Sequence, residues 1–252
     1  MKKIFFCLLA LVLTTSAVLA EETLRMGSYN VEYSENATAE EIGEMLKAYN
    51  LDIVGFNEAP DGDWTARVGK AMGLDNVYVG TVSSANHVNK YKTILSRYPL
   101  TNCHEFELDA AGGWNPASAV GAEIQVGTHS ISFYSTHICF NGNQDDHAKL
   151  LVDSIMKADK TDLIIVVGDF NCKVDHTSGI KHFFDVGFKN MWLELGIDTT
   201  DLYTWNALNP EENLGVIDQI VVKGNAEFTD GNMIELERPL SDHKPIWCEI
   251  KF

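Results

Sequence analysis

One stretch of this sequence restricts the fold more than any other. Residues 163–167 read Leu-Ile-Ile-Val-Val, and this apolar run stops abruptly at Gly168-Asp169-Phe170-Asn171. A short, uninterrupted run rich in β-branched residues predicts a central strand buried on both faces, because a strand with one wet face would alternate. A strand of that kind needs further layers of structure on each side, which favours an α/β architecture.

The rest of the chain alternates short strand-like runs with helical patterns, and no linker or repeat interrupts residues 22–252. We predict strands at residues 24–31, 52–56, 77–82, 93–96, 119–126, 129–137, 163–167, 216–222 and 246–251, and helices following Thr38 and at 64–72 and 145–158. Hairpin-like and crossover connections occur together, which argues against a barrel of eight equal βα units. The sequence predicts one α/β domain spanning residues 21–252.

The first 20 residues have the features of a signal peptide. Lys2 and Lys3 form a basic start, an apolar run follows, and short side chains precede Glu21. The apolar run is well below the roughly 20 residues that a membrane-spanning helix needs. We therefore expect residues 1–20 to be cleaved from a bacterial protein that is exported to the periplasm or the medium, with no membrane span.

Four cysteines remain after this cleavage: Cys103, Cys139, Cys172 and Cys248. Export permits disulfide bonds, and four cysteines can pair in three ways among which their spacing does not choose. Buried thiols fit a domain of this size equally well. No C-x-x-C spacing is present, which disfavours structural zinc.

The charge is strongly acidic, with 36 Asp and Glu against 19 Lys and Arg, a formal net charge of −17. A protein held on DNA by a broad basic face is therefore disfavoured, because phosphate neutralisation requires clustered Lys and Arg. A local phosphate site that recruits a divalent cation remains compatible with this charge.

Polar side chains suited to metal and phosphate chemistry recur where the predicted strands end. They are Asn30, Glu58, His137, Asp169, Asn171, Asp218, Asp242 and His243. Most have an ordinary alternative: His137 alone would more often be a satisfied core histidine, and Glu58 a solvated carboxylate. Asp218 is harder to dismiss, since an acid within an apolar strand is costly unless it is paired. Strand ends bring distant segments to one sheet edge, so together these residues predict a catalytic site.

These segments resemble the endonuclease/exonuclease/phosphatase superfamily, which includes deoxyribonucleases, sphingomyelinases and inositol polyphosphate 5-phosphatases. The matching motifs, in family order, are Ser28-Tyr29-Asn30, Asn57-Glu58, Ile94-Leu95-Ser96-Arg97-Tyr98-Pro99, Ser135-Thr136-His137, Gly168-Asp169-Phe170-Asn171, Ile217-Asp218-Gln219-Ile220 and Ser241-Asp242-His243. The resemblance implies a four-layered α/β sandwich, in which two mixed β-sheets pack face to face and are flanked by helices.

The resemblance also implies a metal site. Glu58 would bind Mg²⁺, with Mn²⁺ as a substitute, and Asn30 would lie close by as a ligand or phosphate contact. Asp242 would sit near the metal or orient a histidine. A hard cation that keeps several waters needs few protein oxygens, so this donor set is chemically reasonable.

The catalytic roles implied by the resemblance describe in-line attack of water on phosphorus. Asp169 would orient and deprotonate the water, and Asn171 would donate a hydrogen bond to the phosphoryl group. His137 and His243 would contact the non-bridging oxygens, one of them as a cation or proton donor. Asp218 would hold His243 through a ring nitrogen.

Several positions depart from the nuclease pattern. Asn57 replaces the usual Gln before the metal-binding Glu, and Val216 stands where many nucleases carry Arg. Residues 114–118 contain no Arg, and residues 87–92 contain no acid to pair with the first histidine. The leading hypothesis is therefore a secreted, monomeric, Mg²⁺-dependent phosphoesterase acting on a small or flexible phosphodiester or phosphomonoester.

Two alternatives stay open. In a secreted nuclease acting on DNA or RNA, Lys90, Lys92 and Arg97 would form a small basic patch, and aromatic side chains would stack on bases. The aromatic candidates are Trp114, Tyr203 and Trp205. The other alternative is a binding module that has lost catalysis, which is disfavoured because each proposed catalytic position holds a competent side chain. Asn115 and Trp205 are the candidate substrate contacts.

Overall fold

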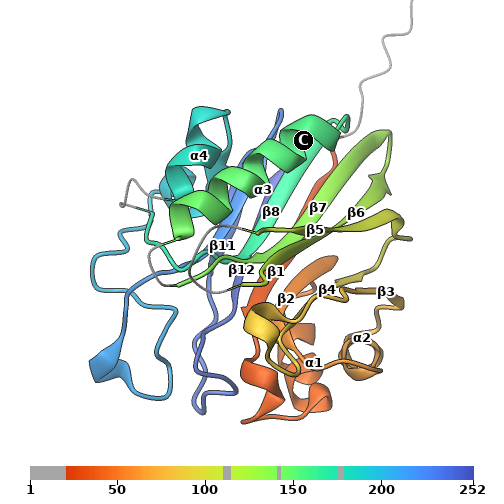
Figure 1. The fold of residues 1–252 in the computed structure, drawn as a ribbon. Coiled ribbons are helices and arrows are strands. Elements are labelled where there is room, and N and C mark those ends of the chain that lie inside the picture. Colours follow the sequence, from red (N-terminus) through yellow and green to blue (C-terminus); the bar gives the residue numbers. More distant parts are fainter. Residues whose placement is uncertain (1–20, 110–114, 141–142, 175–178) are drawn as a thin grey trace, which may run out of the picture.

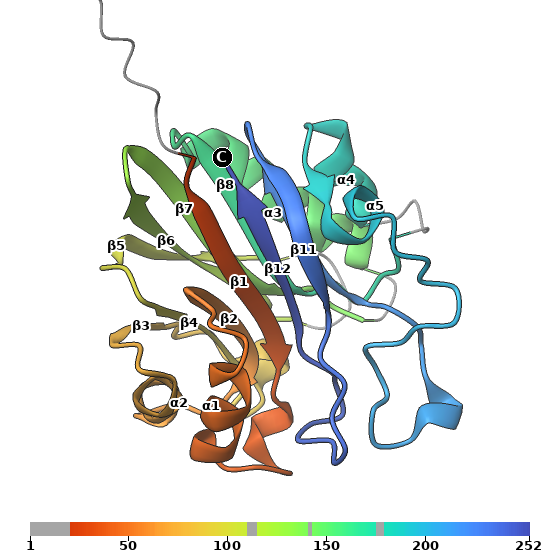
Figure 2. The ribbon, with the colours of Figure 1, turned by 180° about the vertical axis from the view of Figure 1, so that it is seen from behind.

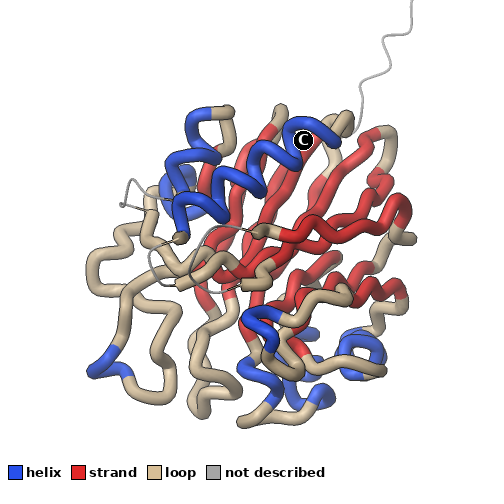
Figure 3. The backbone as a smooth tube through the Cα atoms, in the orientation of Figure 1, coloured by secondary structure: helices blue, strands red, loops and turns tan. Residues whose placement is uncertain are grey.

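Two six-stranded mixed sheets lie face to face at the centre of the computed structural model, which describes residues 21–109, 115–140, 143–174 and 179–252 (Figure 1). The first sheet has the order β11-β12-β1-β2-β4-β3, and the second has the order β5-β6-β7-β8-β10-β9. Helices cover the two outer faces, as the separation of blue and red segments in Figure 3 shows. The four-layered α/β sandwich implied by the resemblance is confirmed.

The strands of the first sheet are β1 (Thr23–Asn30), β2 (Ile53–Ala59), β3 (Asn76–Val79), β4 (Tyr91–Ser96), β11 (Glu227–Met233) and β12 (Ile246–Lys251). Those of the second are β5 (Thr101–Glu107), β6 (Ser118–Val126), β7 (His129–His137), β8 (Leu163–Asp169), β9 (Lys189–Asn190) and β10 (Asp218–Lys223). The helices are α1 (Ala39–Lys47), α2 (Trp64–Met72), α3 (Gln144–Ala158), α4 (Ile180–Asp185) and α5 (Met191–Glu194).

Three apolar clusters hold the layers together. Between the sheets, Met26 and Ile53 share one cluster with Phe133 and Ile165. Outside the first sheet, α1 and α2 pack their buried residues, such as Ile42 and Val68, against the strands. Outside the second sheet, α3 and α4 do the same with Leu151, Ile155 and Phe183. Figure 2 shows β1, β12 and β11 side by side on the face opposite to α3.

Local sequence signals account for the helix boundaries. Thr38 caps α1: its hydroxyl accepts from the Glu41 amide, and the Glu41 carboxylate accepts from the Thr38 amide. This reciprocal arrangement satisfies two amide groups that a helix start leaves unpaired. α2 ends at Gly73, whose φ of 79° is the left-handed conformation that glycine adopts without a steric penalty. The predicted helix start at Thr38 and the helix at 64–72 are confirmed.

The strand registers bring the predicted polar residues to one edge. In the parallel pair β1–β2, Asn30 is opposite Asn57, and in the parallel pair β7–β8, His137 is opposite Asp169. Asp218 begins β10 directly opposite Asp169 in an antiparallel pair. Gly168 permits the tight approach of β8 to β7, because a Cβ there would lie 1.9 Å from the carbonyl oxygen of Thr136.

The structure also differs from the predicted elements. It adds β5, β9, β11, α4 and α5, which the sequence patterns did not indicate. The strands β5 and β11 are sheet edges with mixed, largely polar sequences, so they lack the apolar alternation that marks a half-buried strand. The strand predicted at 77–82 ends at Val79, and β2 continues past residue 56 to Ala59.

The proposed signal peptide and Trp114 lie outside the described residues. Within the described segments, no disulfide forms: Cys103 is exposed, whereas Cys139, Cys172 and Cys248 are buried. None of the helices in those segments is both long enough and apolar enough to cross a membrane.

Candidate active site

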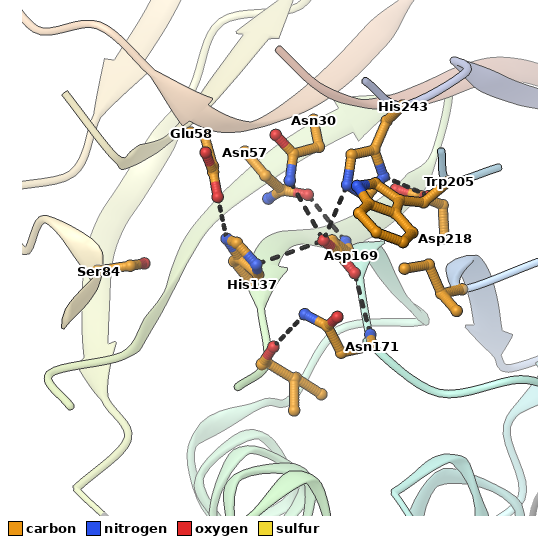
Figure 4. A network of polar contacts seen from close by, with 12 residues as sticks. Asn30, Asn57, Glu58, Ser84, His137, Asp169, Asn171, Trp205, Asp218 and His243 are labelled. Atoms are coloured by element: carbon orange, nitrogen blue, oxygen red, sulfur yellow. Dashed lines mark hydrogen bonds and ion pairs between the residues drawn. The ribbon is translucent and has the colours of Figure 1, made fainter. Parts of the chain in front are cut away.

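A cavity of about 300 Å³ opens at the edge where the strands of both sheets end. The residues that line it are Asn30, Glu58, Lys90, His137, Phe140, Asp169, Asn171, Trp205, Leu214, Ile217, Asp242 and His243. Eight of the ten sequence-predicted site residues are in this set, drawn from segments across more than 200 residues of sequence. Figure 4 shows the polar side chains pointing towards one another.

Asp169 lies at the centre of the polar network. Its Oδ2 accepts a hydrogen bond from Asn30 Nδ2 at 3.2 Å and lies 3.3 Å from His137 Nε2 and 3.5 Å from His243 Nε2. Its other oxygen, Oδ1, accepts from the backbone amide of Asn171 at 3.0 Å. Two imidazoles from different sheet segments therefore face a single carboxylate oxygen (Figure 4).

Asp218 stands behind His243 rather than on the cavity wall. His243 Nδ1 lies 2.9 Å from Asp218 Oδ2, and both side chains are buried. A carboxylate that accepts from Nδ1 leaves Nε2 to face Asp169. The pair is held in turn by Thr204, whose hydroxyl accepts from the amides of Ile217 and Asp218.

The pKa values of the two histidines shift in opposite directions. Burial would lower the pKa of His243, but the negative charges of Asp218 and Asp169 outweigh it and raise that pKa to about 10. The pKa of His137 falls well below its usual value, first because the ring is buried and then because Lys90 and Lys92 repel a positive charge. At neutral pH, His243 is therefore the cationic imidazole and His137 the neutral one.

Asp169 has a pKa raised to about 7. Burial is the main cause, and the negative charge of Asp218 adds to it, while His243 and the hydrogen bonds from Asn171 and Asn30 act in the opposite direction. A carboxylate whose pKa approaches neutrality accepts a proton more readily than an ordinary one. Such a shift in a cavity, with named charged partners, is typical of functional carboxylates.

Asn57 supports this network from the opposite sheet. Its Oδ1 accepts from the Asp169 amide at 2.8 Å, and its Nδ2 donates to Ser135 Oγ at 3.2 Å. The sheets approach closely beside it at Gly55, where a Cβ would lie 2.5 Å from a Val167 methyl group. A shorter amide than the usual Gln therefore reaches across the inter-sheet space to Asp169. The sequence marked Asn57 only as a departure from the family pattern, and its bridging role depends on a sheet-to-sheet distance that local sequence does not encode.

Two of the site residues, Glu58 and Asn171, have an unusual backbone conformation. Glu58 and Asn171 adopt positive φ values of 51° and 48°, which non-glycine residues rarely do. Both positions lie at strand ends beside the cavity: Glu58 is the penultimate residue of β2, and Asn171 lies two residues after the end of β8. Asn171 Nδ2 donates to the carbonyl of Ile138 at 2.9 Å, which fixes the side chain beside Asp169. Left-handed backbone held in place by such contacts is common at functional sites.

Glu58 and Asn30 are the oxygen donors that a hard cation could use. Glu58 is buried and lines the cavity, with its Oε1 2.8 Å from Lys90 Nζ and 3.8 Å from His137 Nδ1. Asn30 Oδ1 accepts from the Glu32 amide at 3.2 Å. The described residues form no cluster of three or more His, Cys, Asp or Glu suited to a metal ion. One carboxylate and one amide oxygen fit Mg²⁺, which keeps several waters, better than zinc, which needs more protein ligands.

Asp242 is tied to Trp205. The indole Nε1 donates to Asp242 Oδ2 at 2.8 Å, and Ser241 Oγ donates to Asp242 Oδ1 at 3.2 Å. The Asp242 amide donates to the carboxylate of Glu32 at 3.1 Å. Asp242 thus orients Trp205 on the cavity wall and shares its acidic surroundings with Glu32, an acid that no sequence motif singled out.

Other predicted residues lie elsewhere. Asn115 lines a separate cavity, and its Oδ1 lies 3.0 Å from His147 Nε2, so the structure does not bring it to the cavity that holds Asp169. The prediction that Lys90, Lys92 and Arg97 form an exposed basic patch is wrong. Lys92 is fully buried and donates to the carbonyl of Val82, while Arg97 pairs with Asp52 at 2.7 Å. Both side chains therefore have partners within the protein and do not form a surface for a nucleic acid.

Comparison with solved structures finds the same fold in proteins of low sequence identity. An endonuclease/exonuclease/phosphatase from Bacteroides vulgatus is 17% identical with a TM-score of 0.74, covering 91% of this chain and 98% of that one. A Bacteroides thetaiotaomicron mannosyl-6-phosphatase is 18% identical with a TM-score of 0.71, covering 91% of this chain and 100% of that one. TDP2 from D. rerio, solved with a single-strand DNA product, is 16% identical with a TM-score of 0.71, covering 90% of this chain and 98% of that one.

Sequence comparison points the same way. No curated protein matches the chain significantly. The sequence profile described as the Endonuclease/Exonuclease/phosphatase family matches residues 27–243, a span that begins just before Asn30 and ends at His243. The match thus includes every residue of the polar network around Asp169. This chain belongs to the endonuclease/exonuclease/phosphatase family and is a phosphoric ester hydrolase.

Proposed function

We propose that the protein is an exported, Mg²⁺-dependent phosphoesterase that hydrolyses a small or flexible phosphodiester, or a phosphomonoester, by in-line attack of water. The observation that carries this proposal is the position of Asp169, whose Oδ2 is faced by Asn30, His137 and His243 inside one cavity. Export rests on the signal-like residues 1–20 alone.

The protein residues perform the proton and charge steps. Asp169 accepts the proton of the attacking water as the new P–O bond forms, and its raised pKa suits a base at neutral pH. Cationic His243 and the amide of Asn171 stabilise the negative charge that develops on the phosphoryl oxygens. The bond from phosphorus to the leaving oxygen breaks as the new bond forms, and that oxygen leaves with a proton from solvent or from His243.

Glu58 and Asn30 would hold the cation. Bound there, Mg²⁺ supplies positive charge to the phosphoryl group and lowers the cost of bringing an anion into this acidic cavity. Since Glu58, Asp169 and Asp242 line the cavity, an added positive charge there would favour the binding of a phosphate. Mn²⁺, which also prefers oxygen donors, would substitute.

A nuclease is the second candidate. Trp205 and the exposed Phe140 are aromatic side chains beside the catalytic groups, where a base could stack. The burial of Lys92 and the pairing of Arg97 with Asp52 remove two of the three cationic side chains of the basic patch that a long nucleic acid would use. This observation favours a compact substrate.

Hydrolysis of bis-p-nitrophenyl phosphate by the protein with Mg²⁺, with Mn²⁺ and with a chelator tests the proposal. We expect turnover with either metal, none with chelator, and a loss of about 10²-fold or more in kcat for Asp169→Asn. Asp153→Asn, a carboxylate change on the exposed face of α3, is the matched control and should retain full activity. A folded protein that is inactive with both metals would contradict the proposal and favour a binding module.

Substrate class requires a second comparison. Initial rates on plasmid DNA, RNA, sphingomyelin and phosphorylated sugars, at equal phosphate concentration, separate the two candidates. We expect the highest kcat/KM on a small substrate. Rapid plasmid nicking that weakens steeply with added salt would instead identify a nuclease.

A further inference from the structure

Lys90 is the only Lys or Arg among the described residues that line the cavity. It immediately precedes β4, and its side chain is 11% exposed, matched by 10% for Glu58. The ammonium lies 2.8 Å from Glu58 Oε1 and 4.6 Å from the centre of the Tyr33 ring. A buried, hydrogen-bonded charge pair of this kind is well defined in geometry, and its members are costly to separate.

The position of this ammonium bears on the metal site. Glu58 is the only carboxylate in the oxygen-donor pair proposed to hold Mg²⁺, and one of its two oxygens is already engaged by Lys90. Two cations that share one carboxylate repel each other at short range. Metal binding at Glu58 must therefore weaken or displace the contact with Lys90.

The lysine side chain is suited to such a displacement. Its charge is compact and sits on a flexible four-carbon stem with three donors, so it can change partners without backbone movement. Outside Glu58, the other groups on the cavity wall that could attract it are carboxylates already bound elsewhere, such as Asp242 to Trp205. An incoming phosphate would bring oxygens that have no hydrogen-bond partner within the fold, and the ammonium of Lys90 could turn to them.

We propose that Lys90 is a positioning residue. Its ammonium neutralises Glu58 when no metal is bound, and it moves to the phosphoryl oxygens of the substrate when the metal binds. This inference rests on the proposed metal-dependent function, because it assumes that Glu58 holds the cation. It assigns to one side chain two opposite effects: Lys90 weakens metal binding and strengthens phosphate binding.

Direct binding measurements separate these effects. Mn²⁺ affinity is measured by the EPR signal of the free ion, without substrate, for the full chain and for Lys90→Met, Lys90→Arg and Glu58→Gln. We expect Lys90→Met to bind Mn²⁺ more tightly by about tenfold or more, because a like charge has been removed from beside the site. Lys90→Arg, which keeps the charge, should stay close to the unmodified protein.

Phosphate binding gives the reciprocal readout. With Mn²⁺ at saturation, inorganic phosphate should bind Lys90→Met more weakly than the unmodified protein, by about tenfold. The rise in melting temperature on adding Mn²⁺ should also be larger for Lys90→Met, because that variant lacks the internal cation in the metal-free state. If Lys90→Met fails to fold, Lys90→Gln removes the charge while leaving a donor for Glu58, and the same measurements apply.

The outcomes are distinguishable. If Glu58→Gln loses Mn²⁺ binding but Lys90→Met binds Mn²⁺ no more tightly than the unmodified protein, the role of Lys90 is overturned and the metal site stands. If Glu58→Gln binds Mn²⁺ as well as the unmodified protein, the proposed metal site itself fails, and the inference with it. Tighter Mn²⁺ binding with unchanged phosphate binding would overturn the second half of the inference.

Discussion

His243 Nδ1 lies 2.9 Å from Asp218 Oδ2, and this contact fixes the direction in which the imidazole presents its other nitrogen to Asp169. Asp218 comes from the first residue of β10, and His243 comes from the loop before β12, so the pair joins the two sheets. The contact also supplies the negative charge that raises the pKa of His243.

Replacing Asp218 tests this relationship. Asp218→Asn keeps the volume but removes the charge and can present an N–H to Nδ1, so His243 is no longer held as a cation with Nε2 aimed at Asp169. We expect kcat on bis-p-nitrophenyl phosphate to fall about 10²-fold with a small change in KM, as for loss of an oriented charged group. His243→Ala should lose at least as much, and the double variant little more than His243→Ala. Additive losses would show that the two residues act independently.

Asn57 is expected to matter for stability and for activity. Asn57→Ala leaves the buried Asp169 amide and Ser135 hydroxyl without these partners, which should lower the free energy of unfolding by about 1–3 kcal/mol. Ser135→Ala removes the contact with Asn57 and the hydrogen bond that Ser135 Oγ donates to the Phe56 carbonyl, but it leaves the Asp169 amide bonded. We therefore expect kcat to be lower for Asn57→Ala than for Ser135→Ala, with urea denaturation measuring the stability of both variants. The reverse order in kcat would mean that Asn57 does not position Asp169.

Trp205 is expected to act through its indole N–H. Trp205→Phe keeps a ring on the cavity wall but loses the 2.8 Å hydrogen bond to Asp242. We expect kcat/KM to fall about 3- to 10-fold, as for a single hydrogen bond to a charged group, and Trp205→Ala to fall further. Equal losses in the two variants would assign the effect to the hydrogen bond alone and leave the ring without a role.

The buried side chain of Lys92 should make the stability of the protein depend on pH. Burial lowers the pKa of this lysine from 10.5 to about 8, with its ammonium held by the Val82 carbonyl and Ser84 hydroxyl. Between these two values the unfolded chain binds the proton that the folded protein has released, so the contribution of Lys92 to stability rises as the pH increases from 8 to 10.5.

The measurement compares the protein with Lys92→Met, because other groups also titrate in this range. The free energy of unfolding of the unmodified protein relative to Lys92→Met should increase by about 1–3 kcal/mol between pH 7.5 and 10. All measurements are made at one ionic strength, so that the screening of charges is the same at each pH. A difference that stays flat or decreases with pH would show that Lys92 is charged in the folded protein throughout.

The sequence indicated the central elements better than the edges. The apolar run at 163–167 and the alternating segment at 129–137 became β8 and β7, because strands with this many buried positions leave a clear hydrophobic pattern in the sequence. The edge strands β5 and β11 carry no such pattern, since an edge has few buried positions. Short helices such as α4 and α5 depend on packing against the sheet rather than on their own sequence.

The sequence likewise indicated some residues of the candidate site and not others. Asn30, His137 and Asp169 could be found because each ends a recognisable strand and parallel registers bring such ends together. Asn57 and Lys90 could not be assigned, because their partners are set by the distance between sheets and by the course of a loop. Asn115, a candidate substrate contact, lines a different cavity and lies against His147 instead, because its partner comes from α3, 32 residues further along the chain.

The contribution of both sheets to one network has a consequence for folding. Asn30 and Glu58 come from the first sheet and His137, Asp169 and Asp218 from the second, so neither sheet carries a complete set of reactive groups. Catalytic competence can arise only after the two sheets have packed against each other. Recovery of enzyme turnover during refolding would consequently time this packing step, later than the signals that report helix or strand formation within either sheet.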